Sequence, residues 1–104
     1  MNLNDSSLFR QQCFIDGDWV DADSGETVNV VNPANGETIG TMPNAGAIET
    51  RRAIEAADAA WPAWRKYTAK ERSAVIRAWY DLILANTDDL AMFCLLYTSP
   101  SPRD

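Results

Sequence analysis

Residues 13–20 read CFIDGDWV, two short runs of strand-forming residues on either side of an Asp-Gly pair. Asp16-Gly17 suits a type I′ turn, because both central residues of that turn need positive φ. The stretch therefore predicts a tight hairpin in which Cys13–Ile15 pairs with Asp18–Val20. A lone hairpin is not stable in water, so this one needs packing partners from elsewhere in the chain.

A second hairpin is predicted downstream of the first. The runs TVNVV (27–31) and TIGTM (38–42) flank NPANGE, in which Pro33 and Asn35-Gly36 favour a turn. The sequence shows no internal repeat, since each predicted hairpin has its own turn residues.

Beyond Pro43 the apolar residues recur with helical spacing. One face of the first predicted helix carries Ile54, Ala57, Trp61 and Trp64. Glu49 and Glu55 lie early in this helix, where the helix dipole favours acidic side chains. Pro62 disfavours the α conformation at Trp61, so we expect the helix to end or kink there.

A capping box opens the next predicted helix. In Thr68-Ala-Lys-Glu71 the threonine oxygen accepts a first-turn amide and the glutamate reaches back to the cap. An apolar stripe follows, made of Val75, Ile76, Trp79, Tyr80, Leu82 and Ile83. We expect this helix to run to about Asn86, and residues 87–90 to begin a third helix.

These helix faces carry more apolar surface than two hairpins can cover. A wide apolar stripe beside isolated hairpins indicates that most of the packing partners lie elsewhere. The predicted fold class is α/β, and the chain is expected to be the start of a larger α/β protein.

The composition is that of a globular protein of 104 residues, 46% hydrophobic, with a net charge of −6. It has no basic patch, which argues against nucleic acid and anionic membranes as partners. It also has no apolar run of membrane-spanning length and no signal peptide. Two cysteines without a disulfide framework indicate a reduced, cytoplasmic protein. Without histidine, a Ser-His-Asp or Cys-His arrangement cannot form within the chain.

The acidic run DGDWVDADSGE (16–26) raises the question of a calcium site. A calcium loop of the EF-hand type needs a third oxygen ligand two residues after the second. Asp16 and Asp18 are followed by Val20 at that position. We interpret the acidic residues as an exposed hairpin edge, where charge discourages aggregation.

Three other features have a structural and a functional interpretation. Trp61 and Trp64, beside Arg65 and Lys66, could stack on bases, but their helical spacing favours core packing. Cys13 lies in an apolar strand run and has no neighbouring base to lower its pKa. We therefore interpret it as a small buried hydrophobic residue. Gly36 and Gly40 lack the spacing of a phosphate-binding loop. The residues alone therefore assign no catalytic, cofactor-binding or metal-binding side chain.

The order of these motifs resembles a known family. FIDGDWVDADSGET (14–27), VVNPANGETIGTMP (30–43) and ETRRAIEAADAAWPAWRKYTAKERSAVIRAWYDLI (49–83) look like the opening of the NAD(P)-dependent aldehyde dehydrogenases. Ile15-Asp16-Gly17 replaces the I-N-G that is commoner in that family. The leader LNDSSLFRQQ (3–12) and the segment PAWRKYTAKER (62–72) are similar to bacterial succinate-semialdehyde dehydrogenases. Related glutarate-semialdehyde dehydrogenases share these sequence features. The resemblance spans about residues 2–93.

The resemblance implies a fold, a reaction and a cofactor. In this family a cysteine thiolate attacks the aldehyde, hydride passes to NAD or NADP, and a glutamate activates the water that hydrolyses the thioester. Those residues lie beyond the end of this chain in family members, and Cys13 does not match the catalytic motif. Residues 1–93 are therefore expected to be an incomplete, inactive part of the cofactor-binding domain. The complete protein is expected to be a homo-oligomer.

The last eleven residues depart from the family pattern. CLLYTSPSPRD (94–104) matches one reading frame of a common transposase-based sequencing adapter, residue for residue. We interpret it as a non-native, disordered tail and exclude it from the fold. The alternative for the whole chain is a small, non-enzymatic protein-interaction module that exposes its apolar helix faces to a partner.

Overall fold

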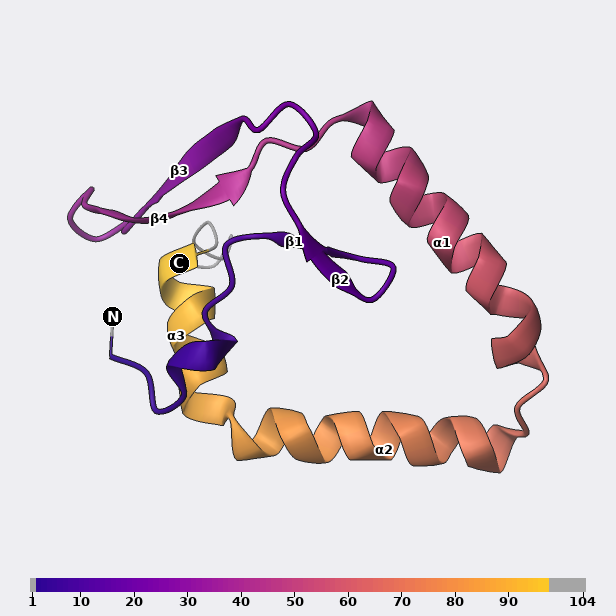
Figure 1. Cartoon of the computed structure of the whole chain (residues 1–104). Coiled ribbons are helices and arrows are strands. Elements are labelled where there is room, and N and C mark those ends of the chain that lie inside the picture. Colours follow the sequence, from indigo (N-terminus) through magenta and orange to yellow (C-terminus); the bar gives the residue numbers. More distant parts are fainter. Residues whose placement is uncertain (1, 98–104) are drawn as a thin grey trace.

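The computed structural model describes residues 2–97, and the side chains of residues 2–95 (Figure 1). The elements are a 3-10 helix (Ser6–Leu8), β1 (Cys13–Ile15), β2 (Asp18–Val20), β3 (Thr27–Val31), β4 (Thr38–Pro43), α1 (Ala47–Arg65), α2 (Ala69–Ala85) and α3 (Thr87–Tyr97). The strands form two separate two-stranded sheets, β1–β2 and β3–β4. In Figure 1 the three helices follow one another around an open frame, and the β1–β2 hairpin projects into it.

The first hairpin has the predicted strands and turn. Antiparallel pairing joins Cys13 to Val20 and Ile15 to Asp18. Asp16 has φ of 52° and Gly17 has φ of 80°. Positive φ at both turn residues is the condition for a type I′ turn, so the Asp-Gly prediction is confirmed.

The second hairpin is also confirmed, with one irregularity. β3 and β4 pair antiparallel from Thr27 opposite Pro43, and the register shifts between Val30 and Val31. Asn32 closes the turn, because its side-chain oxygen accepts the Ala34 N–H at 2.9 Å and its own N–H donates to the Glu37 carbonyl at 2.7 Å. An asparagine side chain that binds the backbone two residues on is a common turn former.

The first helix is longer than predicted. α1 continues through Pro62 and ends at Arg65, so the helix does not end at Trp61, and the alternative of a kink there stays a prediction. Pro62 lies in the last turn, where its missing N–H removes one bond near a helix end. The last turn closes instead with tighter bonds, from the Lys66 N–H to the Ala63 carbonyl (3.2 Å) and from the Tyr67 N–H to the Trp64 carbonyl (3.1 Å).

The second and third helices begin where predicted. Thr68 caps α2, and Asn86 follows its last residue. α3 begins at Thr87 and continues through Tyr97, so residues 94–97 of the expected tail are helical. The remainder of that tail, residues 98–104, lies outside the described residues.

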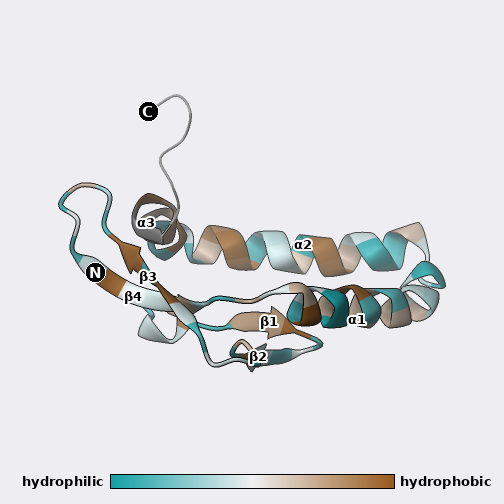
Figure 2. Cartoon of the chain, turned by 90° about the horizontal axis from the view of Figure 1, so that it is seen from above, coloured by the Kyte–Doolittle hydropathy of each residue, from teal (hydrophilic) through white to brown (hydrophobic). Residues whose placement is uncertain are grey.

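The described chain has almost no core. The buried apolar residues are Ala22 and Val30, whereas the α2 stripe is exposed, with Ile76 at 56% and Trp79 at 65%. Figure 2 shows apolar segments recurring along α2. The radius of gyration is 16.6 Å, whereas a compact domain of this length has about 13 Å. The two hairpins thus leave these helix faces uncovered, as predicted, and the existence of packing partners elsewhere stays a prediction.

Candidate functional site

An acidic residue occupies the third position of each α-helix. These residues are Glu49 in α1, Glu71 in α2 and Asp89 in α3. Carboxylates are favoured there because the first turn presents unpaired amides and the positive end of the helix dipole. The three side chains bind different partners, and those partners determine how the elements are joined.

Glu49 joins α1 to the loop between β2 and β3. Its Oε2 accepts the Gly46 N–H at 2.8 Å, and its Oε1 accepts the Asp23 N–H at 2.7 Å. The side chain is 6% exposed. The amide of Asp23 first, and then that of Gly46, hold the pKa of the Glu49 carboxyl below its ordinary value of 4.5.

An ion pair lies at the edge of the same junction. Arg52 Nη2 is 2.7 Å from Asp23 Oδ1, and both side chains are exposed. The hydrogen bond to the Asp23 carboxylate raises the pKa of the Arg52 guanidinium. An exposed pair of this kind adds little to stability, so the buried Glu49 carboxylate is the main contact of the junction.

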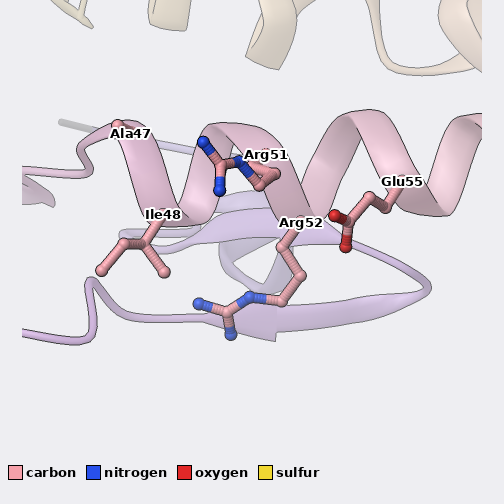
Figure 3. A pocket seen from close by; sticks show the side chains of 5 residues that line it. All are labelled: Ala47, Ile48, Arg51, Arg52 and Glu55. Atoms are coloured by element: carbon pink, nitrogen blue, oxygen red, sulfur yellow. The ribbon is translucent and has the colours of Figure 1, made fainter.

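A hollow of about 290 Å³ lies along one face of α1 (Figure 3). Its lining consists of Ala47, Ile48, Arg51, Arg52 and Glu55. In Figure 3 the Arg52 and Ile48 side chains extend toward the neighbouring strands, whereas Arg51 lies along the helix. Arg52 is already paired with Asp23, and the lining has no nucleophile beside a base. The hollow therefore has no arrangement that supports catalysis.

Asp89 connects α3 to the N-terminal residues. Its Oδ1 accepts the Asn4 N–H at 2.8 Å, and its Oδ2 accepts the Asp5 N–H at 2.9 Å. The side chain is 3% exposed, although it lies in the first turn of a helix. One carboxylate thus satisfies two consecutive amides that are more than eighty residues away in the sequence.

The residues considered for metal binding lie in and beside the first hairpin turn. Asp16 is in the turn and Asp18 begins β2. Among residues 2–97 the structure contains no group of three or more His, Cys, Asp or Glu side chains placed to hold a metal ion. It brings no further acidic ligand to this turn within that range.

The tryptophans considered for base stacking are not in a core within the described part of the chain. Trp61 is 50% exposed, and Trp64 is half-buried against Tyr67 with 5.4 Å between ring centroids. Cys13 is half-buried in β1. Gly36 has φ of 77° in the turn before β4, and Gly40 pairs with Val30, so neither joins a strand to a helix. The structure does not bring these residues together into one site.

Sequence reasoning missed the roles of Glu49 and Asp89. Glu49 was assigned only a favourable place near the helix start, and its spacing of three from Gly46 is the signal that predicts a capping contact. Asp89 has the same kind of position, but nothing near it in the sequence points to Asn4 and Asp5. Contacts between distant segments leave no local pattern.

The described chain, two hairpins followed by three helices, matches one known protein family. The aldehyde dehydrogenase family model matches residues 19–100, and the chain belongs to this family. Within the family the chain is similar to semialdehyde dehydrogenases. It is 63% identical over 91 residues to glutarate-semialdehyde dehydrogenase of Pseudomonas putida. The aligned region covers 88% of this chain and 19% of that protein.

Two further relatives support the same placement. Identity is 54% over 96 residues to the NADP(+) succinate-semialdehyde dehydrogenase of Escherichia coli, covering 92% of this chain and 20% of the relative. The crystal structure of succinate-semialdehyde dehydrogenase from Burkholderia pseudomallei matches with a TM-score of 0.88 at 53% identity, covering 92% of this chain and 20% of that one. The chain thus spans about a fifth of the length of these relatives, and it matches their N-terminal part.

No helix among the described residues is both long and apolar enough to cross a membrane.

Proposed function

We propose that this chain is the N-terminal section of an enzyme that oxidises a semialdehyde to a carboxylic acid with NAD or NADP. The observation that carries the proposal is the 63% identity to a glutarate-semialdehyde dehydrogenase over 91 residues. The 54% identity to a succinate-semialdehyde dehydrogenase of the NADP(+) type supports the same reaction class. Succinate semialdehyde and glutarate semialdehyde are therefore the two substrates to test, and both nicotinamide cofactors are to be compared.

The role proposed for this section is structural. Its hairpins and α1 would form an outer part of the cofactor-binding domain, and the apolar faces of α1 and α2 would pack on parts of the enzyme that follow. Exposed Ile54 and Trp61 on α1, and Ile76 and Trp79 on α2, support this proposal. Burial of one such side chain contributes roughly 1.5–3 kcal/mol, so two covered stripes would add substantially to the stability of a complete domain.

The proposed chemistry places no catalytic side chain in the section. The family reaction needs a cysteine thiolate, an oxyanion-binding amide and a carboxylate base. Cys13 is half-buried in β1 and exposed acidic residues surround the first turn, an arrangement unlike an activated thiol. We therefore expect the 104-residue chain to form no NAD(P)H with either semialdehyde. Turnover above an enzyme-free control would contradict this expectation.

Sequencing of the source locus tests the proposal as a whole. We propose that the native sequence departs from CLLYTSPSPRD after Phe93, although the family match runs to residue 100 and α3 to Tyr97. Adapter-free genomic reads should continue the frame into a family sequence that includes a catalytic cysteine motif. A stop codon directly after the codon for Asp104 would contradict the proposal. The recovered full-length enzyme can then be assayed with both semialdehydes.

The alternative is a free-standing interaction module, and the same exposed stripe on α2 favours it. A module of this kind must fold by itself, whereas a section of an enzyme need not. Cooperative unfolding of the isolated chain therefore separates the two proposals. The homo-oligomeric state and the cytoplasmic location stay predictions.

A further inference from the structure

The N-terminal residues make contacts with three other parts of the chain. We name residues 4–12 the N-terminal strap. Besides the amides of Asn4 and Asp5 on Asp89, the strap contributes Phe9, whose ring lies 6.2 Å from that of Phe93 at an interplanar angle of 17°. These contacts attach the first half of the strap to α3.

The second half of the strap is attached to both hairpins. The Arg10 guanidinium lies 5.0 Å from the centroid of the Trp19 ring on β2. Gln11 Oε1 accepts the Thr41 N–H of β4 at 2.8 Å. Gln12 Nε2 donates to Asp21 Oδ1 at 3.2 Å. The strap therefore connects α3 with the β1–β2 and β3–β4 hairpins.

The shape of the strap matches one face of α3. Asp89 and Phe93 are four residues apart and so lie on the same side of that helix. Asp5 and Phe9 are also four residues apart, and the 3-10 helix Ser6–Leu8 between them brings both into contact. Asp5 caps this short helix, since its Oδ1 accepts the Ser7 hydroxyl and the Ser7 N–H. Those two bonds lower the pKa of the Asp5 carboxyl.

Both carboxylate oxygens of Asp89 accept hydrogen bonds from the strap. The corresponding acids of α1 and α2 bind back to their own helix starts, at Gly46 and at Thr68. Asp89 instead uses both oxygens for Asn4 and Asp5 and is 3% exposed. Its neighbour Asp88 lies in the same first turn and is exposed. Two acids with the same charge and dipole environment thus differ in burial and in contact.

We propose that Asp89 is a latch that holds the N-terminal strap on α3, and that the latched strap fixes α3 against the two hairpins. The inference goes beyond the proposed function, because it concerns the internal assembly of this section. Loss of the carboxylate would leave two consecutive amides without their acceptors. The strap would then release α3 while the hairpin turns and α2, which depend on local contacts, stay formed.

Amide hydrogen exchange on the full-length enzyme proposed above, resolved to single amides by mass spectrometry, tests the latch. We expect the Asn4 and Asp5 amides to exchange about tenfold more slowly than in a peptide of residues 1–12, as charged hydrogen bonds predict. Asp89→Ala removes both acceptor oxygens and should return both amides to the peptide rate.

Asp88→Ala is the matched control, since it removes the same carboxylate from the same turn and should leave both rates unchanged. The Arg72 amide, bonded to the Thr68 carbonyl at 3.0 Å in α2, is the internal reference. Peptide-like rates at Asn4 and Asp5 in the unmodified enzyme would overturn the proposal. An equal effect of the two variants, or equal acceleration at Arg72, would overturn it as well.

Discussion

Glu49 and Asp89 are the charged residues that the described structure buries, and each binds two backbone amides. A buried carboxylate is costly unless it is hydrogen-bonded, and these four bonds satisfy that requirement. Each carboxylate joins a helix start to a segment distant in the sequence. At the scale of single residues, these two side chains therefore determine how the helices are attached to the hairpins.

The Glu49 junction is predicted to open in acid. Because the pKa of Glu49 is lowered in the folded chain, its contribution to stability is present above the unfolded pKa and is lost as pH falls through the folded one. The Gly46 amide reports this change directly, since it donates to Glu49 Oε2. An NMR titration of that amide should show a midpoint below 4.5, the ordinary value of the carboxyl.

Glu49→Gln should abolish the titration of the Gly46 amide. Glu55→Gln, an exposed change on the same helix, should leave it in place. A midpoint above the ordinary carboxyl value, or a titration that survives in Glu49→Gln, would show that another group controls this junction.

Residues whose partners are close in sequence could be predicted. Asp16 and Gly17 determine the first turn because their own backbone angles are the constraint. The partners of Asp89 are Asn4 and Asp5, and no periodicity or motif connects positions so far apart. The helical capping position of Asp89 could be predicted from the sequence, but not the strap that it holds.

At the scale of elements, the capping box predicted where α2 begins, and a single proline misled the prediction of where α1 ends. The Thr68 and Glu71 capping box is formed, with bonds of 3.1 Å and 2.8 Å. Pro62 affects one hydrogen bond, and in the last turn of α1 that loss does not stop the helix. Both hairpins followed from their turn residues. The register shift beside Val31 had no sequence signal.

The capping box of α2 is predicted to account for a measurable part of its helicity. In a peptide of residues 67–86, Thr68→Ala leaves the Glu71 amide without its acceptor and should cost about 1 kcal/mol. A short helix alone is marginal, so far-UV circular dichroism should show a clear loss of helicity. Ser73→Ala, in the middle of the same helix, should not reduce it. Equal helicity in the parent peptide and Thr68→Ala would contradict the role of the cap.

At the scale of the whole molecule, the exposed apolar faces and the radius of gyration of 16.6 Å describe an incompletely packed chain. The sequence could predict that the helix faces carry more apolar surface than the two small hairpins can cover. The sequence could not predict what covers those faces, because its apolar pattern describes the faces themselves and carries no information about a covering surface. The chain spans about a fifth of the length of its relatives, and the proposed function assigns the covering surfaces to the remaining length.

The α2 stripe is predicted to bind a hydrophobic dye. The double substitution of Ile76→Ser with Trp79→Ser removes two side chains that are more than half exposed, so it should lower dye fluorescence and leave the far-UV spectrum almost unchanged. Replacement of a tryptophan in a packed core would instead cost about 3–5 kcal/mol. Lys70→Ser, on the same helix, should leave dye binding unchanged. Loss of helicity in the double variant would indicate that the stripe is already packed.

Differential scanning calorimetry of the purified 104-residue chain tests most directly whether this section depends on partners beyond itself. A self-sufficient domain of about 100 residues unfolds cooperatively with an enthalpy of about 60–80 kcal/mol. Because the large apolar side chains of the 104-residue chain are exposed, we predict a broad signal without a cooperative heat-absorption peak. A single sharp transition whose calorimetric and van't Hoff enthalpies agree would contradict the account and favour an independent module.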